Sequence, residues 1–365
     1  MKLLSIVGAR PQFIKLMPLV REFKKSSFKS SHIHKILHTG QHYDYLMNKL
    51  FFDEFGLPQP DYNLEIGSGP HGYQTGEMLK KIEIVLLNEK FDIVIVYGDT
   101  NSTLAGALAS VKLKIPVAHI ESGLRSYNKN MPEEINRVLT DHISDFLFCP
   151  TLNAVENLRR EGIKRNIFLV GDIMFDSLKI SLMIAEKKKI EIIEKLNLKP
   201  KEYILATIHR AENTDNKEKL YSIFSTFDEI SNKIMPVIVP LHPRTKKVLG
   251  LYEKERDFKK IKIIEPVSYF EMLILEKKAK IILTDSGGVQ KEAFWLGIPC
   301  ITLREETEWV ETVKTGKNIL VGTDKKRILK AVKKFYKLDN TSSSKINKKK
   351  NVSLKILKIL FSKTK

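Results

Sequence analysis

Acidic side chains and a histidine stand beside short apolar runs of the sequence. Asp99, Glu121 and His209 follow such runs, and Glu133 opens a helix-like segment. Carboxylates and a histidine near one substrate can transfer protons to and from it. Each alone is more often a helix cap or a salt-bridge partner, but four at corresponding places predict a shared acid–base site. His209 has no second histidine at a metal-ligand spacing beside it, so we expect no metal at this site and no cofactor.

The turn after the first apolar run predicts an anion site. Gly8 permits a tight turn, and Pro11 suits the first turn of a helix. Arg10 and Lys15 then stand near a helix amino terminus, whose free N–H groups already favour an anion. A phosphate is the ligand that this combination indicates.

A second turn, in Thr284–Glu292, has matching features. Ser286, Gly287 and Gly288 join an apolar run to a helix and would present backbone N–H groups to a phosphate. Glu292, on that helix, could accept hydrogen bonds from a ribose diol. No Lys-Ser/Thr pair follows the glycines, which argues against a Walker loop. Further basic side chains stand near strand ends or the acidic residues, and with Gly287 we expect them to bind the substrate or its phosphates: Arg137, Arg210, His242 and Arg244.

The segment Gly67–Gly72 fits the pattern G-x-G-x-x-G literally. It does not follow a strong apolar run, it contains Pro70, and no acidic strand end follows about 20 residues later. We interpret it as a turn-rich loop.

The elements that must position these residues alternate along the chain. The predicted strands are Lys2–Val7, Ile93–Val96, Pro116–Ile120, Phe146–Cys149, Ile167–Val170, Tyr203–Ile208, Pro236–Pro240, Ile261–Ile264, Lys280–Thr284 and Cys300–Leu303. The predicted helices include Phe13–Lys24, Leu104–Leu113, Asn153–Glu161 and Val289–Gly297. Such alternation predicts an open α/β fold with parallel sheets, in which ligands bind at the carboxyl ends of strands.

The length of 365 residues suits two domains. We predict an amino-terminal domain over 1–171 with the catalytic carboxylates, a second over 172–340 with the nucleotide site, and a basic tail or final helix over 341–365. The predicted site lies in the cleft between the two domains. The short apolar amino terminus and the lack of a long apolar run predict a cytoplasmic protein without membrane insertion.

The net charge of +19 is concentrated near the carboxyl terminus. Residues 325–365 hold 15 Lys or Arg and one acid, so the rest of the chain has 47 basic against 42 acidic residues. This favours a solvated, partly disordered lysine-rich tail over a nucleic-acid surface. Cys149 and Cys300 are widely separated, so no disulfide framework is expected.

Several motifs together resemble one enzyme family. They are GARPQFIK (Gly8–Lys15), HTGQHYD (His38–Asp44), YGDTNSTLAGALA (Tyr97–Ala109), AHIESGLRS (Ala118–Ser126), MPEEINR (Met131–Arg137), TIHRAEN (Thr207–Asn213), LHPRT (Leu241–Thr245) and LTDSGGVQKEA (Leu283–Ala293). The chain resembles the non-hydrolysing UDP-N-acetylglucosamine 2-epimerases over roughly residues 1–324. Segment Arg304–Glu311 (REETEWVE) is more similar to the branch acting on UDP-2,3-diacetamido-2,3-dideoxyglucuronate.

The resemblance implies a glycosyltransferase-B fold of two Rossmann-like domains, a homodimer and a UDP-activated 2-acetamido sugar as substrate. It implies catalytic roles for Asp99, Glu121, Glu133 and His209. It implies substrate or UDP binding by Arg10, Lys15, Ser286, Gly288, Glu292 and Arg304. The family's glycine-rich YGDG segment is missing here, and Lys345–Ser353 takes its place.

The resemblance implies an isomerase that eliminates UDP to a 2-acetamidoglycal and adds it back, for surface polysaccharide precursors. The uronate substrate is slightly preferred over UDP-N-acetylglucosamine. A hydrolysing epimerase releasing N-acetylmannosamine and UDP is the alternative. A glycosyltransferase ranks third, because Asp285 stands where the E-x7-E pattern has its first Glu. A non-catalytic sensor ranks last.

Overall fold

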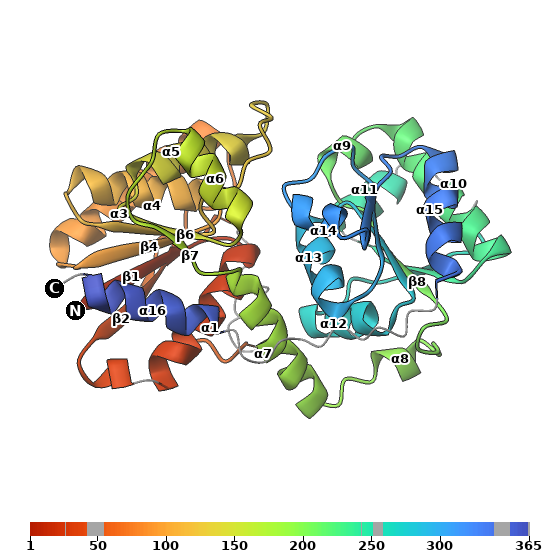
Figure 1. Ribbon diagram of the computed structural model, residues 1–365, viewed down its shortest axis with the longest axis horizontal. Helices are drawn as coiled ribbons and strands as arrows, with labels where there is room; N and C mark the ends of the chain where they lie inside the picture. The colour runs from red at the N-terminus through yellow and green to blue at the C-terminus, as the bar shows by residue number, and fades with distance from the viewer. Residues whose placement is uncertain (26, 42–54, 242, 251–257, 339–350, 364–365) are drawn as a thin grey trace. The chain divides into compact units, whose positions relative to one another are not determined.

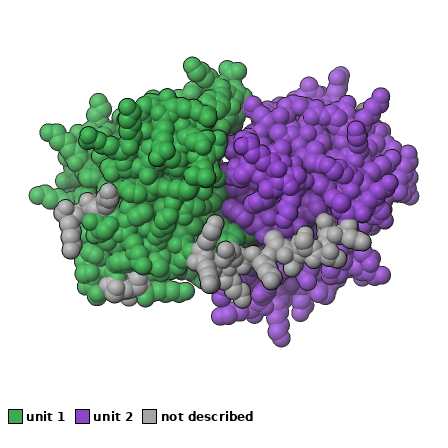
Figure 2. All heavy atoms as spheres, in the orientation of Figure 1, with its two compact units in different colours: residues 1–180, 348–365 green, residues 181–347 purple. Residues whose placement is uncertain are grey.

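The computed structural model describes residues 1–25, 27–41, 55–241, 243–250, 258–338 and 351–363. The chain forms two compact units, which Figure 2 colours separately. Unit 1 comprises Met1–Ile180 and Lys348–Lys365, and unit 2 comprises Ser181–Asn347. Each unit has one parallel sheet with helices packed on it, which confirms the α/β prediction.

The sheet of unit 1 has seven strands in the order β3-β2-β1-β4-β5-β6-β7 (Figure 1). The strands are β1 (Lys2–Val7), β2 (Ile33–His38), β3 (Tyr62–Asn63), β4 (Ile93–Tyr97), β5 (Val117–Ile120), β6 (Phe146–Cys149) and β7 (Ile167–Leu169). Chain order reverses between β1 and β4, which pair directly. The carboxyl ends of these strands therefore form the switch point at which sheets of this kind bind ligands.

Helices on the faces of this sheet bury its apolar side chains. They are α1 (Arg10–Lys25), α3 (His71–Asn88), α4 (Asn101–Lys112), α5 (Pro132–Ile143), α6 (Leu152–Arg160), the first part of α7 (Ile173–Lys187) and α16 (Val352–Lys363), with a short 3-10 turn at Ser27–Ser30. Leu4 and Ile6 of β1 pack with Met78 and Ile82 of α3 in one buried cluster. Of the predicted loop Gly67–Gly72, Gly67–Pro70 is a loop, whereas His71 and Gly72 already form the first turn of α3, so the prediction was wrong for these two residues.

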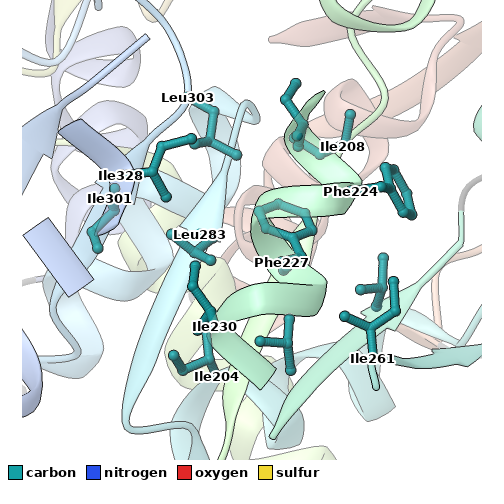
Figure 3. Close-up of a cluster of buried hydrophobic side chains, with 14 of the residues drawn as sticks. Ile204, Ile208, Phe224, Phe227, Ile230, Ile261, Leu283, Ile301, Leu303 and Ile328 are labelled. Atoms are coloured by element: carbon teal, nitrogen blue, oxygen red, sulfur yellow. The ribbon is translucent and has the colours of Figure 1, made fainter. Parts of the chain in front are cut away.

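The sheet of unit 2 has six strands in the order β10-β9-β8-β11-β12-β13. They are β8 (Ile204–Thr207), β9 (Val237–Pro240), β10 (Lys262–Ile264), β11 (Ile281–Thr284), β12 (Cys300–Thr302) and β13 (Asn318–Leu320). The helices are α8 (Ile192–Lys195), α9 (Ala211–Thr214), α10 (Lys217–Lys233), α11 (Pro243–Gly250), α12 (Tyr269–Lys278), α13 (Gly287–Leu296), α14 (Val310–Lys314) and α15 (Lys325–Tyr336). Phe224, Phe227 and Ile230 of α10 pack with Leu283 of β11 and Ile328 of α15 (Figure 3).

The carboxyl-terminal region differs from the predicted solvated tail. Its described part contains α15, in unit 2, and α16, which packs on α1 in unit 1 (Figure 1). The ring of Phe361 stacks on that of His32 with centroids 4.1 Å apart. Asp176 of α7 accepts hydrogen bonds from the backbone N–H and the hydroxyl of Ser353, at 2.9 and 2.8 Å. The lysine-rich composition concealed an apolar face on each helix, so the prediction of a solvated, partly disordered tail was wrong for these segments. The alternative of a final helix within 341–365 agrees with α16.

Among the described residues, no helix combines the length and apolar character needed to cross a membrane.

Candidate active site

A buried ion pair in unit 1 joins helix α1 to the end of strand β5. Lys15 of α1 donates from Nζ to Oε1 of Glu121, and the two residues are only 7% and 9% exposed. Gly98 lies beside them with φ +65°, and a Cβ on it would come within 2.7 Å of Lys15 Nζ. Because any side chain there would meet the lysine, Gly98 lets the ends of β4 and β5 approach α1 closely.

A second ion-pair system lies after β4. Arg137 of α5 donates from Nε and Nη2 to Oδ2 of Asp99, and from Nη1 to Glu134. The carboxylate of Glu134 also accepts the backbone N–H groups of Ser126 and Tyr127 at 2.9 Å each. Burial opposes ionisation of Glu134, but these hydrogen bonds and the charge of Arg137 outweigh it and lower the pKa of that carboxyl.

Glu133 and Glu134 are neighbours in sequence but have opposite environments. Glu134 is buried in the network just described, whereas Glu133 is exposed on the first turn of α5. Only the exposed one is free to meet a ligand without breaking a structural contact. Arg137 was predicted to bind substrate; its guanidinium is engaged by the two carboxylates in this structure, and its contact with substrate stays a prediction.

Polar residues that the sequence analysis did not single out hold these turns in place. Gln12 accepts the backbone N–H groups of Gly8 and Ala9, at 2.7 and 3.0 Å. The two ring nitrogens of His119 contact Asp141 and the carbonyl of Gly98, each at 2.7 Å. Gln12 stands inside the GARPQFIK motif and His119 inside the AHIESGLRS motif, two residues before Glu121, so motif membership was the available signal. Arg10 is exposed at the start of α1.

In unit 2, Asp285 organises the turn that contains His209. Its carboxylate lies 3.2 Å from His209 Nδ1 and accepts the backbone N–H groups of His209 and Arg210. Asn213 adds a side-chain hydrogen bond at 3.0 Å. Burial would raise the pKa of Asp285, but the contacts with His209, Asn213 and Arg210 prevail and lower it. A carboxylate that fixes the orientation of a histidine is a common feature of active sites.

The Ser286–Gly287–Gly288 turn opens α13 in unit 2, as predicted. A Cβ on Gly287 would come within 2.7 Å of Oε1 of Glu308, so a side chain here would have to displace the Glu308 carboxylate. Arg304 donates from Nη1 to Glu308 at 3.1 Å, which holds this carboxylate beside the start of the helix. An acidic group near a helix amino terminus is electrostatically favoured, and a phosphate there would be favoured for the same reason.

The structure describes some of the remaining predicted residues and not others. Glu292 is buried on α13 and accepts a hydrogen bond from the hydroxyl of Tyr269 at 2.7 Å. Arg210 immediately precedes α9. His242 lies outside the described residues, as does the side chain of Arg244. Asp99, Glu121 and Glu133 belong to unit 1 and His209 to unit 2, and their sharing of one substrate stays a prediction.

Two Rossmann-like units, one with acidic strand ends and one with a phosphate-type turn, define the two-domain glycosyltransferase-B fold. A family model described as UDP-N-acetylglucosamine 2-epimerase matches residues 25–360. The chain therefore belongs to the UDP-N-acetylglucosamine 2-epimerase family, whose named members are isomerases acting on carbohydrates.

Three relatives place the chain within this family. A UDP-N-acetylglucosamine 2-epimerase homolog of Methanococcus maripaludis is 56% identical over 99% of both chains. UDP-2,3-diacetamido-2,3-dideoxy-D-glucuronate 2-epimerase of Pseudomonas aeruginosa is 49% identical over 91% of this chain and 92% of the relative. The crystal structure of Methanocaldococcus jannaschii UDP-GlcNAc 2-epimerase in complex with UDP-GlcNAc and UDP is 51% identical, with a TM-score of 0.89, covering 99% of this chain and 100% of that one.

Proposed function

We propose that the enzyme inverts C2 of a UDP-activated 2-acetamido sugar without net hydrolysis. The observation that carries the proposal is the pair of carboxylates, Asp99 and Glu121, each in an ion pair at the carboxyl end of adjacent strands β4 and β5. Fixed carboxylates of this kind can act as proton acceptors and donors. The turn at Ser286 in unit 2 is suited to a diphosphate, and the M. jannaschii relative was crystallised with UDP-GlcNAc and UDP.

The chemistry of the substrate favours elimination over direct deprotonation. The C2–H bond of such a sugar lies beside the anomeric carbon and not beside a carbonyl, so its removal alone gives no stabilised enolate. When a base takes the C2 proton, the C–H electrons form the C1=C2 bond and the C1–O electrons leave with UDP. A 2-acetamidoglycal results. A diphosphate oxygen then adds to C1 while a proton reaches C2 from the opposite face.

We assign Asp99 and Glu133 as the proton-transfer pair, with Glu121 orienting the sugar or sharing a proton. His209, Arg10 and the turn from Ser286 to Gly288 would stabilise the diphosphate as its negative charge develops. Retention of UDP beside the glycal distinguishes epimerisation from hydrolysis, since loss of UDP would commit the intermediate to water.

UDP-2,3-diacetamido-2,3-dideoxyglucuronate is the slightly preferred substrate, on the basis of segment Arg304–Glu311 and of the 49% identical relative of that name. UDP-N-acetylglucosamine is the second candidate, favoured by the 51% identical structure that was crystallised with it. In either case the product would be a precursor of a surface polysaccharide.

Proton NMR in D2O with each candidate tests the proposal. We expect deuterium at C2 together with a new manno-configured nucleotide sugar. Deuterated free sugar plus UDP would instead establish the hydrolysing alternative. No exchange with either sugar, in protein that binds UDP, would overturn the proposal in favour of a transferase.

Two aspartate variants give this experiment a matched comparison. Asp99→Asn should slow exchange at C2 by about 100-fold or more. Asp92→Asn should not, because Asp92 binds the backbone N–H of Lys2 at 2.6 Å, at the amino end of the same sheet.

A further inference from the structure

A second buried carboxylate stands behind Glu292. Glu276 lies on α12, which packs against α13, and its side chain is 0% exposed to solvent. Within the described part of the chain, neither of its carboxylate oxygens has a hydrogen-bond partner that could serve as a donor to an ionised group. None of the motifs in the sequence includes this residue, and the reaction proposed above does not use it.

The group that contacts Glu276 is itself an acid. Its carboxyl is within hydrogen-bonding reach of the carboxylate of Glu292, which is 4% exposed. Three other titratable groups lie nearby. A negative charge on Glu276 would raise the pKa of Tyr203 and of Cys300. The hydroxyl of Tyr269 donates a hydrogen bond to Glu292. Burial, followed by the charge and contact of Glu292, raises the pKa of Glu276 well above its usual value.

Two carboxylates in contact inside a dry core do not both ionise. An unpaired buried charge is strongly disfavoured, and two neighbouring carboxyl groups relieve this by sharing one proton. Of the two, Glu292 already accepts a hydrogen bond from Tyr269, which stabilises it as the acceptor. The proton therefore belongs on Glu276, from which it can be donated to Glu292.

We propose that Glu276 is a positioning residue which, in its protonated form, donates a hydrogen bond to Glu292 and holds that carboxylate in place for the ribose diol of UDP. This inference rests on the proposed function, since it takes Glu292 as the ligand of the ribose. Tyr269 and Glu276 lie seven residues apart on α12 and therefore on the same face of that helix. Together they fix the Glu292 carboxylate, and the two donors leave its charge available to the nucleotide.

Calorimetric titration with UDP and with 2′,3′-dideoxy-UDP tests the positioning role. Wild-type protein should prefer UDP. In Glu276→Leu, which has no donor, the affinity for UDP should fall about tenfold while that for the dideoxy analogue is unchanged, on the scale of one lost charge-assisted hydrogen bond. Glu276→Gln, whose amide can donate permanently, should restore most of the preference. In turnover, Glu276→Leu should raise KM with little change in kcat.

Infrared spectroscopy tests the proton independently of any ligand. Wild-type protein at neutral pH should show the carbonyl stretch of a protonated carboxylic acid, and Glu276→Gln should lack it. Absence of this band from the wild type would overturn the proton assignment. An unchanged UDP preference in a folded Glu276→Leu protein would overturn the positioning role.

A different experimental result would show that Glu292 does not bind the ribose of UDP. If wild-type protein and Glu292→Gln both bind UDP and its dideoxy analogue equally, the ribose assignment of Glu292 is wrong, and the role of Glu276 in nucleotide binding is overturned with it. The infrared band would then still report whether Glu276 carries the proton.

Discussion

Arg137 donates two hydrogen bonds to a single carboxylate oxygen of Asp99, from Nε at 2.9 Å and from Nη2 at 2.6 Å. The remaining terminal nitrogen binds Glu134 at 2.7 Å. One guanidinium thus connects the turn after β4 to the first turn of α5, on which Glu133 is exposed. Arg137 therefore links Asp99 to Glu134, whose neighbour in sequence is Glu133.

Replacement of Arg137 should impair catalysis more than folding of the sheet. In Arg137→Met, Asp99 loses its fixed orientation, and we expect exchange at C2 to slow by about 100-fold, the scale of a misplaced catalytic group. Deuterium incorporation followed by NMR measures this. Arg159→Met on the exposed end of α6 is the control and should exchange at the wild-type rate. Wild-type exchange in Arg137→Met would refute the orienting role.

The ion pair of Lys15 and Glu121 predicts an asymmetric pattern of stability. Lys15→Met removes the cation that faces a buried carboxylate and should destabilise the protein by about 3 kcal/mol. Adding Glu121→Gln should recover a large part of this loss, because the buried negative charge is removed as well. Urea unfolding followed by fluorescence gives both values. Lys24→Met, exposed on the same helix, should change stability by less than about 0.5 kcal/mol. Equal stability of Lys15→Met and Lys24→Met would contradict the pairing.

Asp285 predicts a pH-dependent contribution in unit 2. Its pKa is lowered in the folded protein, so its stabilising contacts are fully present above the pKa of an unfolded aspartate, about 3.9, and are lost as the pH falls through the folded value. Asp285→Asn should cost about 2 kcal/mol near neutral pH. The difference between wild type and variant should shrink below about pH 4. A difference that stays constant on acidification would argue against an ionised Asp285.

The stacking of Phe361 on His32 and Phe28 predicts that α16 stabilises unit 1. Phe361→Ala should destabilise this helix by about 2 kcal/mol, because a partly buried aromatic contact is lost. Hydrogen exchange resolved by residue should report faster exchange in α16 and unchanged exchange in α15. Lys358→Ala, at an exposed position of the same helix, should leave both rates unaltered. Protection of α16 that survives Phe361→Ala would mean that other contacts hold it.

Strands such as β4 could be predicted because their residues are buried on both faces and therefore form a continuous apolar run. Strand β2 was not predicted, since Ile33–His38 mixes polar and apolar side chains at the less covered side of the sheet.

The site residues could be predicted from their motifs, but the residues that they contact could not. Lys15 and Glu121 are far apart in sequence, and only the fold brings them together. Glu133 and Glu134 have identical chemistry, so their separation into exposed and buried roles depends on the helical phase of α5. The burial of Glu276 could not be predicted from the sequence, because an isolated glutamate in a helix normally faces water.

The return of α16 to the first unit has a consequence for synthesis on the ribosome. Unit 2 is one continuous stretch, Ser181–Asn347, whereas unit 1 needs residues from both ends of the chain. During translation, the segment that supplies Ser353 to Asp176 and Phe361 to His32 emerges after the whole of unit 2. The amino-terminal unit, although its synthesis starts first, is completed only after unit 2 has been made, and until α16 emerges the surface of α1 that it covers stays open to solvent.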